Sequence, residues 1–160
     1  MENDRFKIIL MLQYFLLCVD LFMNSFSELI RSANLIMLVL FVVQDICIIF
    51  AIIVLFLTFF NTYIFRAGLV VILVKKFKTT IVISFLYLAF CIALHVHGMQ
   101  LRWNEPTIHV TASSFWVLFG IQRVSAVFYY YFYKRTCIVL GDPRFYEYSK
   151  WIHNEFIKRR

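Results

Sequence analysis

The chain has 160 residues, of which 62% are hydrophobic, 19% are aromatic and 16% are charged, and its mean hydropathy is +0.80. A typical soluble domain is about 45–50% apolar and about 25% charged, so the composition excludes a soluble enzyme with its own core. At about 20 residues for each transmembrane helix, the length suits four spans and excludes a large extramembrane domain. We expect one all-α domain over residues 1–160, an integral membrane four-helix bundle with an amphipathic C-terminal helix.

The first predicted span, at about residues 7–24, is the shortest and weakest of the four. Its apolar run Ile8–Val19 follows Arg5 and Lys7, which is also the pattern of a signal peptide. Asp20 and the bulky residues after it disfavour cleavage, so an uncleaved span is preferred while the signal peptide stays the alternative.

The other three spans are predicted at about residues 35–60, 79–99 and 113–133. The second is the longest apolar run in the chain. The fourth ends in an unbroken aromatic run, residues 128–133, followed by the basic pair Lys134 and Arg135. Aromatic residues followed by basic ones are typical of a helix leaving a bilayer.

Residues 142–158 are predicted to form a cytoplasmic tail helix, with Asp142 as N-cap and Pro143 at the first helical position. Phe145, Trp151 and Phe156 lie on or beside its apolar face, which would dock on the membrane surface. A solvated helix that packs on its own loops is the alternative.

The basic residues predict the orientation of the chain in the membrane. Of the 16 lysines and arginines, only Arg31 and Arg102 fall in the two loops on one side, and Arg123 falls within a span. The positive-inside rule therefore predicts that both termini and the middle loop are cytoplasmic. The residues expected to contact anionic lipid of the cytoplasmic leaflet are Lys75, Lys76, Lys78, Lys134 and Arg135, and no nucleic-acid partner is expected.

Three charged residues lie inside the predicted spans, where an isolated charge costs about 2.5–3.5 kcal/mol. Asp45 and Arg123 lie at matched depths and are predicted to form a buried ion pair, with Gln44 or Gln122 filling spare hydrogen bonds. Asp20 and His95 are candidates for a second, shallower polar contact.

The same buried residues also allow a functional interpretation. A small channel or proton-coupled transporter could use Asp20, Asp45, His95 and Arg123 as its pathway. The structural interpretation is preferred, because an aspartate and an arginine of matched depth neutralise each other and the sequence has no internal repeat.

No catalytic site, cofactor or small-molecule substrate is predicted. The spacing of His95, His97 and His109 is not a metal-binding motif, and the sequence lacks the GxSxG turn of a serine hydrolase, so a membrane-embedded enzyme is the weakest alternative. Cys137, just past the fourth span, is a candidate for S-palmitoylation, although an unmodified cysteine is the commoner outcome.

Several short motifs resemble the transmembrane protein 138 family, and the resemblance covers nearly the whole chain, least at the extreme N-terminus and residues 104–112. In chain order they are Asp20-Leu21-Phe22, Asn24-Ser25-Phe26-Ser27-Glu28-Leu29, Gln44-Asp45-Ile46, Phe59-Phe60-Asn61-Thr62, Ala67-Gly68-Leu69-Val70, Lys76-Phe77-Lys78, Leu94-His95-Val96, Leu101-Arg102-Trp103, Gln122-Arg123, Tyr131-Phe132-Tyr133-Lys134-Arg135-Thr136, Leu140-Gly141-Asp142-Pro143 and Phe145-Tyr146.

The resemblance implies a non-enzymatic role in assembling or maintaining the primary cilium. Its members are associated with the ciliary base, with membrane trafficking there and with ciliopathy, and a vacuolar-type membrane location is also attributed to them. Other ciliary-base membrane proteins are the implied partners. The resemblance supplies no catalytic residue and no cofactor, and it supports an uncleaved first span.

Overall fold

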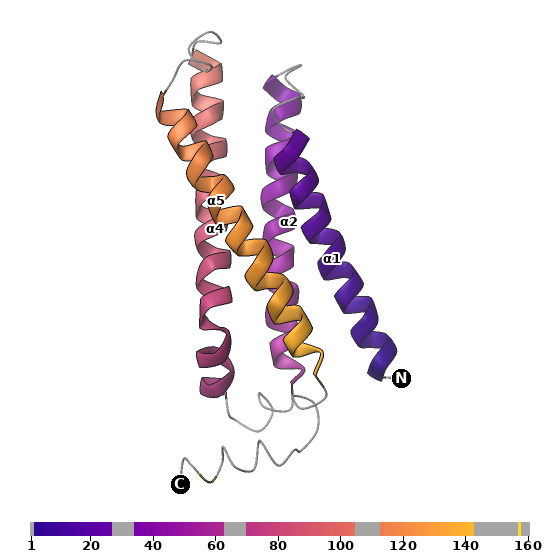
Figure 1. Ribbon diagram of the computed structural model, residues 1–160. Helices are drawn as coiled ribbons and strands as arrows, with labels where there is room; N and C mark the ends of the chain where they lie inside the picture. Colours follow the sequence, from indigo (N-terminus) through magenta and orange to yellow (C-terminus); the bar gives the residue numbers. More distant parts are fainter. Residues whose placement is uncertain (1, 27–33, 63–69, 105–112, 143–156, 158–160) are drawn as a thin grey trace.

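The computed structural model describes residues 2–26, 34–62, 70–104, 113–142 and 157, and this part of the chain folds into four long helices (Figure 1). They are α1 (Glu2–Phe26), α2 (Asn34–Phe60), α4 (Val70–Asn104) and α5 (Ser113–Leu140).

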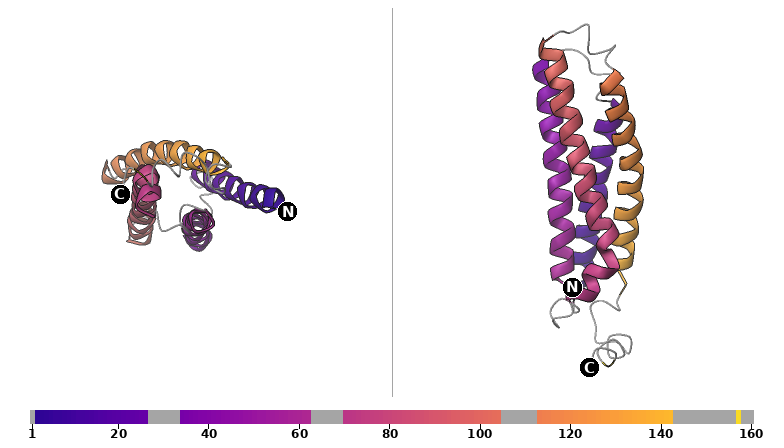
Figure 2. Two further views of the ribbon diagram at one scale, coloured as in Figure 1. Left: turned by 90° about the horizontal axis from the view of Figure 1, so that it is seen from below. Right: turned by 90° about the vertical axis from the view of Figure 1, so that its left-hand side faces the viewer.

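The helices alternate in direction and lie side by side. α1 and α4 begin at the end of the molecule where α2 and α5 finish (Figure 1). α5 packs mainly along α4, α1 packs along α2, and α2 also packs along α4. Seen along the bundle, α5 lies across one side of the assembly, from α4 to α1, and α2 lies on the opposite side (Figure 2). The result is an up-and-down four-helix bundle, as the sequence predicted.

The surface of the bundle is apolar along its length while its interior holds polar groups. Phe15, Val39, Phe85 and Val127 are among the many large hydrophobic side chains that are exposed, one from each helix. Soluble proteins rarely expose apolar patches of that extent. Lipid tails are as apolar as leucine, so in a bilayer such a surface costs nothing and polar side chains are buried between helices instead.

Three helical segments in the described part of the chain are long and apolar enough to cross a membrane, namely Lys7–Phe26, Asn34–Phe60 and Leu73–Trp103. α5 is not among them, because its tyrosines and the pair Gln122 and Arg123 lower its hydropathy. It nevertheless has 28 residues, or about 42 Å of helix, and packs along α4. That a fourth span lies at residues 113–133 therefore stays a prediction.

Two helices are longer than the spans predicted for them. α4 begins at Val70, nine residues before the predicted position 79, so Lys75, Lys76 and Lys78 lie on its first turns instead of in a loop. Its 35 residues measure about 52 Å, well beyond the roughly 30 Å of hydrocarbon, so its ends must reach the headgroups. α5 likewise continues past 133 to Leu140.

The hydrophobic core is concentrated toward the end of the bundle where α4 begins and α5 finishes. We call this the basic end, because it carries Lys75, Lys76, Lys78, Lys134 and Arg135. Tyr87 of α4 stacks on Tyr129 of α5, with ring centroids 4.5 Å apart, and both side chains are fully buried. Phe59 of α2 stacks on Phe77 of α4 at 5.3 Å. The hydroxyl of Tyr133 donates a 2.7 Å hydrogen bond to the Ala51 carbonyl, tying α5 to α2. This end of the bundle supports the polar residues that lie closer to its middle.

Candidate functional site

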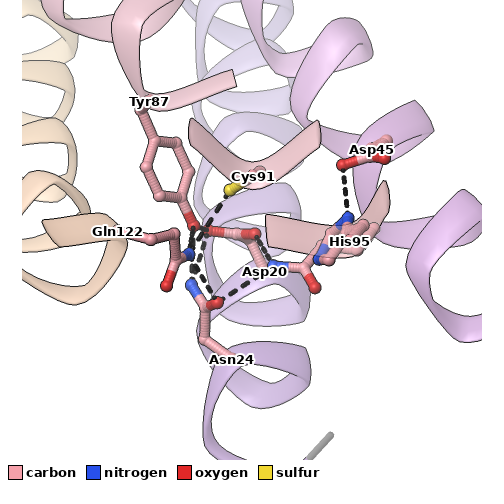
Figure 3. Close-up of polar contacts among 8 residues, drawn as sticks. Asp20, Asn24, Asp45, Tyr87, Cys91, His95 and Gln122 are labelled. Atoms are coloured by element: carbon pink, nitrogen blue, oxygen red, sulfur yellow. Dashed lines mark hydrogen bonds and ion pairs between the residues drawn. The ribbon is translucent and has the colours of Figure 1, made fainter. Parts of the chain in front are cut away.

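The most extensive polar feature is a buried group of side chains supplied by all four helices, which we call the polar cluster (Figure 3). Its members are Asp20 and Asn24 of α1, Gln44 of α2, Tyr87 and Cys91 of α4, and Gln122 and Tyr130 of α5. All are buried apart from Tyr130, which is half-buried.

Asp20 is the acceptor of the polar cluster. One carboxylate oxygen accepts hydrogen bonds from the hydroxyls of Tyr87, at 2.7 Å, and Tyr130. The other oxygen accepts a 2.9 Å hydrogen bond from the Gln44 side-chain amide. The side chain is only 2% exposed. Three donors from three different helices therefore replace the water that this carboxylate would otherwise need.

Asn24 is the connecting residue of the cluster. Its amide nitrogen donates to the hydroxyls of Tyr87, at 2.6 Å, and Tyr130, at 2.8 Å. Its carbonyl oxygen accepts from the amides of Gln44, at 3.1 Å, and Gln122, at 3.0 Å. An asparagine side chain can make about four hydrogen bonds, so Asn24 is fully used. Gln122 spends its second amide hydrogen on the Cys91 sulfur, at 3.3 Å.

This arrangement suits a structural role. Each hydroxyl and each amide donor in the polar cluster has a partner within the cluster, and those partners lie on other helices. A shift of one helix by a single turn, about 5.4 Å, would break several of these hydrogen bonds together. The side-chain carbonyl oxygen of Gln122 is buried without a hydrogen-bond partner among the described residues. Buried networks with this many bonds between helices specify one arrangement of a core, so the cluster fixes the register of the four helices.

A second polar contact joins α2 to α4. His95 Nδ1 lies 3.0 Å from a carboxylate oxygen of Asp45. The imidazole also stacks on Phe41, with centroids 4.2 Å apart and planes inclined by 10°. The His95 side chain is 8% exposed and that of Asp45 is 22% exposed. The ring is held on one side by an aromatic face and at its edge by the carboxylate.

Arg123 stands apart from both polar groups. Its guanidinium lies 4.5 Å above the ring of Phe119, one turn earlier on the same helix, and the residue is half-buried. Among the residues that the structure describes, no carboxylate lies within ion-pair distance of it. A cation over an aromatic ring gains about 0.5–2 kcal/mol, which offsets only part of the cost of a charge at mid-span.

Both predicted pairings of buried charges are corrected by the structure. Asp45 pairs with His95 instead of Arg123, and Asp20 binds tyrosine and amide donors instead of His95. Span boundaries explain part of the difference. α4 continues to Asn104, which places His95 nine residues from its end, or about 14 Å deep, close to the depth of Asp45. α1 ends below the tops of α2 and α4 (Figure 1). Asp20 bonds to Gln44, which lies ten residues into α2, so Asp20 lies deeper in the bundle than expected.

Cys137 is 2% exposed and belongs to the core. The prediction placed it outside the bundle, but α5 continues past residue 133 to Leu140 and packs this residue inside. Acylation requires an accessible thiol, so the structure does not support palmitoylation at this residue.

Two other sets of predicted site residues remain. Phe145, Trp151 and Phe156 of the predicted tail helix lie outside the described residues. The residues expected to contact anionic lipid are all exposed, and they are Lys75, Lys76, Lys78, Lys134 and Arg135.

Sequence reasoning missed Asn24, Tyr87 and Tyr130 as members of a polar site. Each stands in an apolar or aromatic run and carries no charge, so charge counting passed over them. A useful signal was present, because a tyrosine buried in a bilayer needs a partner for its hydroxyl.

In the described segments, no group of three His, Cys, Asp or Glu side chains could hold a metal ion.

Comparisons with known proteins place the chain in a family. The family model described as Transmembrane protein 138 matches residues 37–155. The chain is 50% identical over 160 residues to Transmembrane protein 138 of Mus musculus, 48% to that of Danio rerio and 46% to that of Xenopus tropicalis. Each alignment covers 100% of this chain and 99% of the relative. No solved structure matches. The chain therefore belongs to the transmembrane protein 138 family.

Proposed function

We propose that the chain is a non-enzymatic structural or trafficking adaptor in the membrane at the base of the cilium, with a vacuolar-type membrane as a further location. The ciliary role comes from the family resemblance carried by the motifs quoted above. The observation that favours a structural role is the polar cluster, whose hydroxyl and amide donors are all spent on acceptors within the cluster across four helices. Such a cluster stabilises a scaffold that partners can recognise.

The orientation belongs to the same proposal. Lys7 begins the apolar part of α1, the three lysines of α4 lie on its first turns, and Lys134 and Arg135 lie near the end of α5. These segments meet at one end of the bundle (Figure 1). The positive-inside rule would make that end cytoplasmic, together with both termini.

Arg123 is the residue through which we expect the scaffold to recognise a partner. A guanidinium at mid-span is stable when it faces a counter-charge, and the two described intramembrane carboxylates are engaged by the polar cluster and by His95. The matching partner is another membrane protein whose helix carries an aspartate or glutamate at similar depth.

A channel or proton-coupled transporter is not favoured by any observation on the described residues. The four residues that such a path would use are divided among three separate environments. Asp20 lies among tyrosines and amides, Asp45 with His95 between α2 and α4, and Arg123 over Phe119.

Proximity labelling in ciliated cells tests the proposal. The tagged chain replaces the endogenous protein, and Arg123→Gln and Arg123→Lys are expressed to the same level as the parent. We expect enrichment of ciliary-base membrane proteins, loss of some of them with Arg123→Gln, and their retention with Arg123→Lys, which keeps the charge. Enrichment of membrane proteins from unrelated compartments would contradict the location. An unchanged neighbour set for Arg123→Gln would contradict the role of the guanidinium.

A further inference from the structure

A recess of about 170 Å³ lies between α4 and α5 at the basic end of the bundle, and none of the polar-cluster residues lines it. Its volume is several times the roughly 30 Å³ that one water molecule occupies in the liquid. Its lining comes from the early turns of α4 and the late turns of α5, and the residues are Lys76, Phe77, Thr79, Thr80, Phe132, Arg135, Thr136 and Val139.

The polar side of the recess combines two cations with three hydroxyl groups. Lys76 comes from α4 and Arg135 from α5, and both are exposed. The hydroxyls of Thr80 and Thr136 lie 2.7 Å apart across the two helices, and both residues are buried. Either can donate to the other, so Thr136 can turn its hydrogen toward a ligand when Thr80 donates to it.

Ammonium, guanidinium and hydroxyl donors together suit a ligand that has only acceptor oxygens and a compact negative charge. A phosphate monoester carries about −1.5 to −2 at pH 7 and presents three acceptor oxygens. The planar guanidinium of Arg135 can bind two phosphate oxygens at once, which leaves the third for the other donors that line the recess. A carboxylate has only two oxygens and would leave part of this donor set unused.

The apolar part of the lining favours a phosphate group that is attached to a lipid. Phe77, Phe132 and Val139 give the recess an apolar wall. The recess also lies where the predicted spans end, since Thr79 and Thr80 begin one span and Phe132 and Arg135 flank the end of another. Basic recesses between transmembrane helices at this level bind anionic headgroups.

We propose that the recess between α4 and α5 is a specific site for an anionic lipid with a phosphomonoester headgroup, held by Lys76 and Arg135 and by the Thr79 and Thr136 hydroxyls, with Thr80 donating to Thr136. Such a lipid would contact both α4 and α5 and stabilise their packing at the membrane surface. The general attraction of the other exposed lysines for an anionic leaflet is a separate and less specific effect.

The chain offers a matched pair of variants for the test. Arg135→Gln and Lys134→Gln each remove one positive charge from adjacent, exposed positions of α5, but only Arg135 lines the recess. Native mass spectrometry of the full chain in detergent would measure binding of dioctanoyl phosphatidic acid, with dioctanoyl phosphatidylcholine as the neutral lipid. We expect one tightly bound phosphatidic acid, an affinity about tenfold lower for Arg135→Gln, and a change of less than about twofold for Lys134→Gln.

Two further measurements keep the outcome decisive. Lys76→Gln against Lys78→Gln repeats the comparison on α4, where again only the first residue lines the recess. Competition with inorganic phosphate distinguishes a lipid site from a site for a free anion. Equal losses within both pairs would overturn the site in favour of diffuse attraction. Displacement of the lipid by inorganic phosphate at the same concentration would overturn the lipid assignment.

Discussion

Removing the Tyr87 hydroxyl tests the polar cluster with little change in side-chain volume. Tyr87→Phe deletes one hydrogen bond donated to Asp20 at 2.7 Å and one accepted from Asn24 at 2.6 Å. Hydrogen bonds inside membrane proteins average about 0.6 kcal/mol, and those to charged groups reach about 1.5–3 kcal/mol. We expect Tyr87→Phe to lower the free energy of unfolding by about 1–3 kcal/mol.

The control is Tyr131→Phe, which removes the same hydroxyl from a residue that is 58% exposed. Unfolding of the full chain in dodecyl maltoside by added dodecyl sulfate, followed by circular dichroism, gives both values. The control should change stability by less than about 0.5 kcal/mol, as surface substitutions usually do. Equal effects of the two variants would refute the claim that the Tyr87 hydroxyl holds the helices together.

The contacts of other residues give three further predictions. Asp45→Arg should lower the level of folded protein, and adding Arg123→Asp should not restore that level. The double variant Asp45→His with His95→Asp exchanges the observed partners and should keep part of the folded protein. Rescue of Asp45→Arg by Arg123→Asp would contradict the observed pairing. Gly120→Ala should raise the thermal midpoint, because nothing lies within 4 Å of the added carbon and alanine favours helix by about 1 kcal/mol. Gly98→Ala should gain less or lose stability, since its new carbon would lie 3.2 Å from the Phe115 ring, and a larger gain at Gly98 would contradict that packing.

The helical architecture followed from the sequence because each helix needs only a long apolar run. Hydropathy predicted a helix at residues 35–60, and α2 is observed at Asn34–Phe60. The apolar run ends where the polar residues Asn61 and Thr62 form a turn. The early start of α4 was missed because its lysines suggested a loop, although a helix longer than the hydrocarbon can carry lysines at the headgroups.

The pairing of polar residues could be predicted only in part. Counting residues from a span end gives depth, and Asp45 and Arg123 do have similar depths by that measure. Depth says nothing about which way a side chain points around the helix. Arg123 lies beside Phe119 on its own helix, while His95 of the neighbouring α4 faces Asp45. Contacts between helices depend on rotation and tilt, which the order of residues does not reveal.

The polar cluster serves the fold and not transport. This role is tested most directly by measuring cilium formation per unit of folded protein in cells where Asp20→Asn or Tyr87→Phe replaces the endogenous chain. We predict that both variants lower protein abundance and that ciliation falls in proportion, so that raising expression restores it. Normal abundance and placement with failed ciliation would contradict the account, because the polar cluster would then act beyond folding.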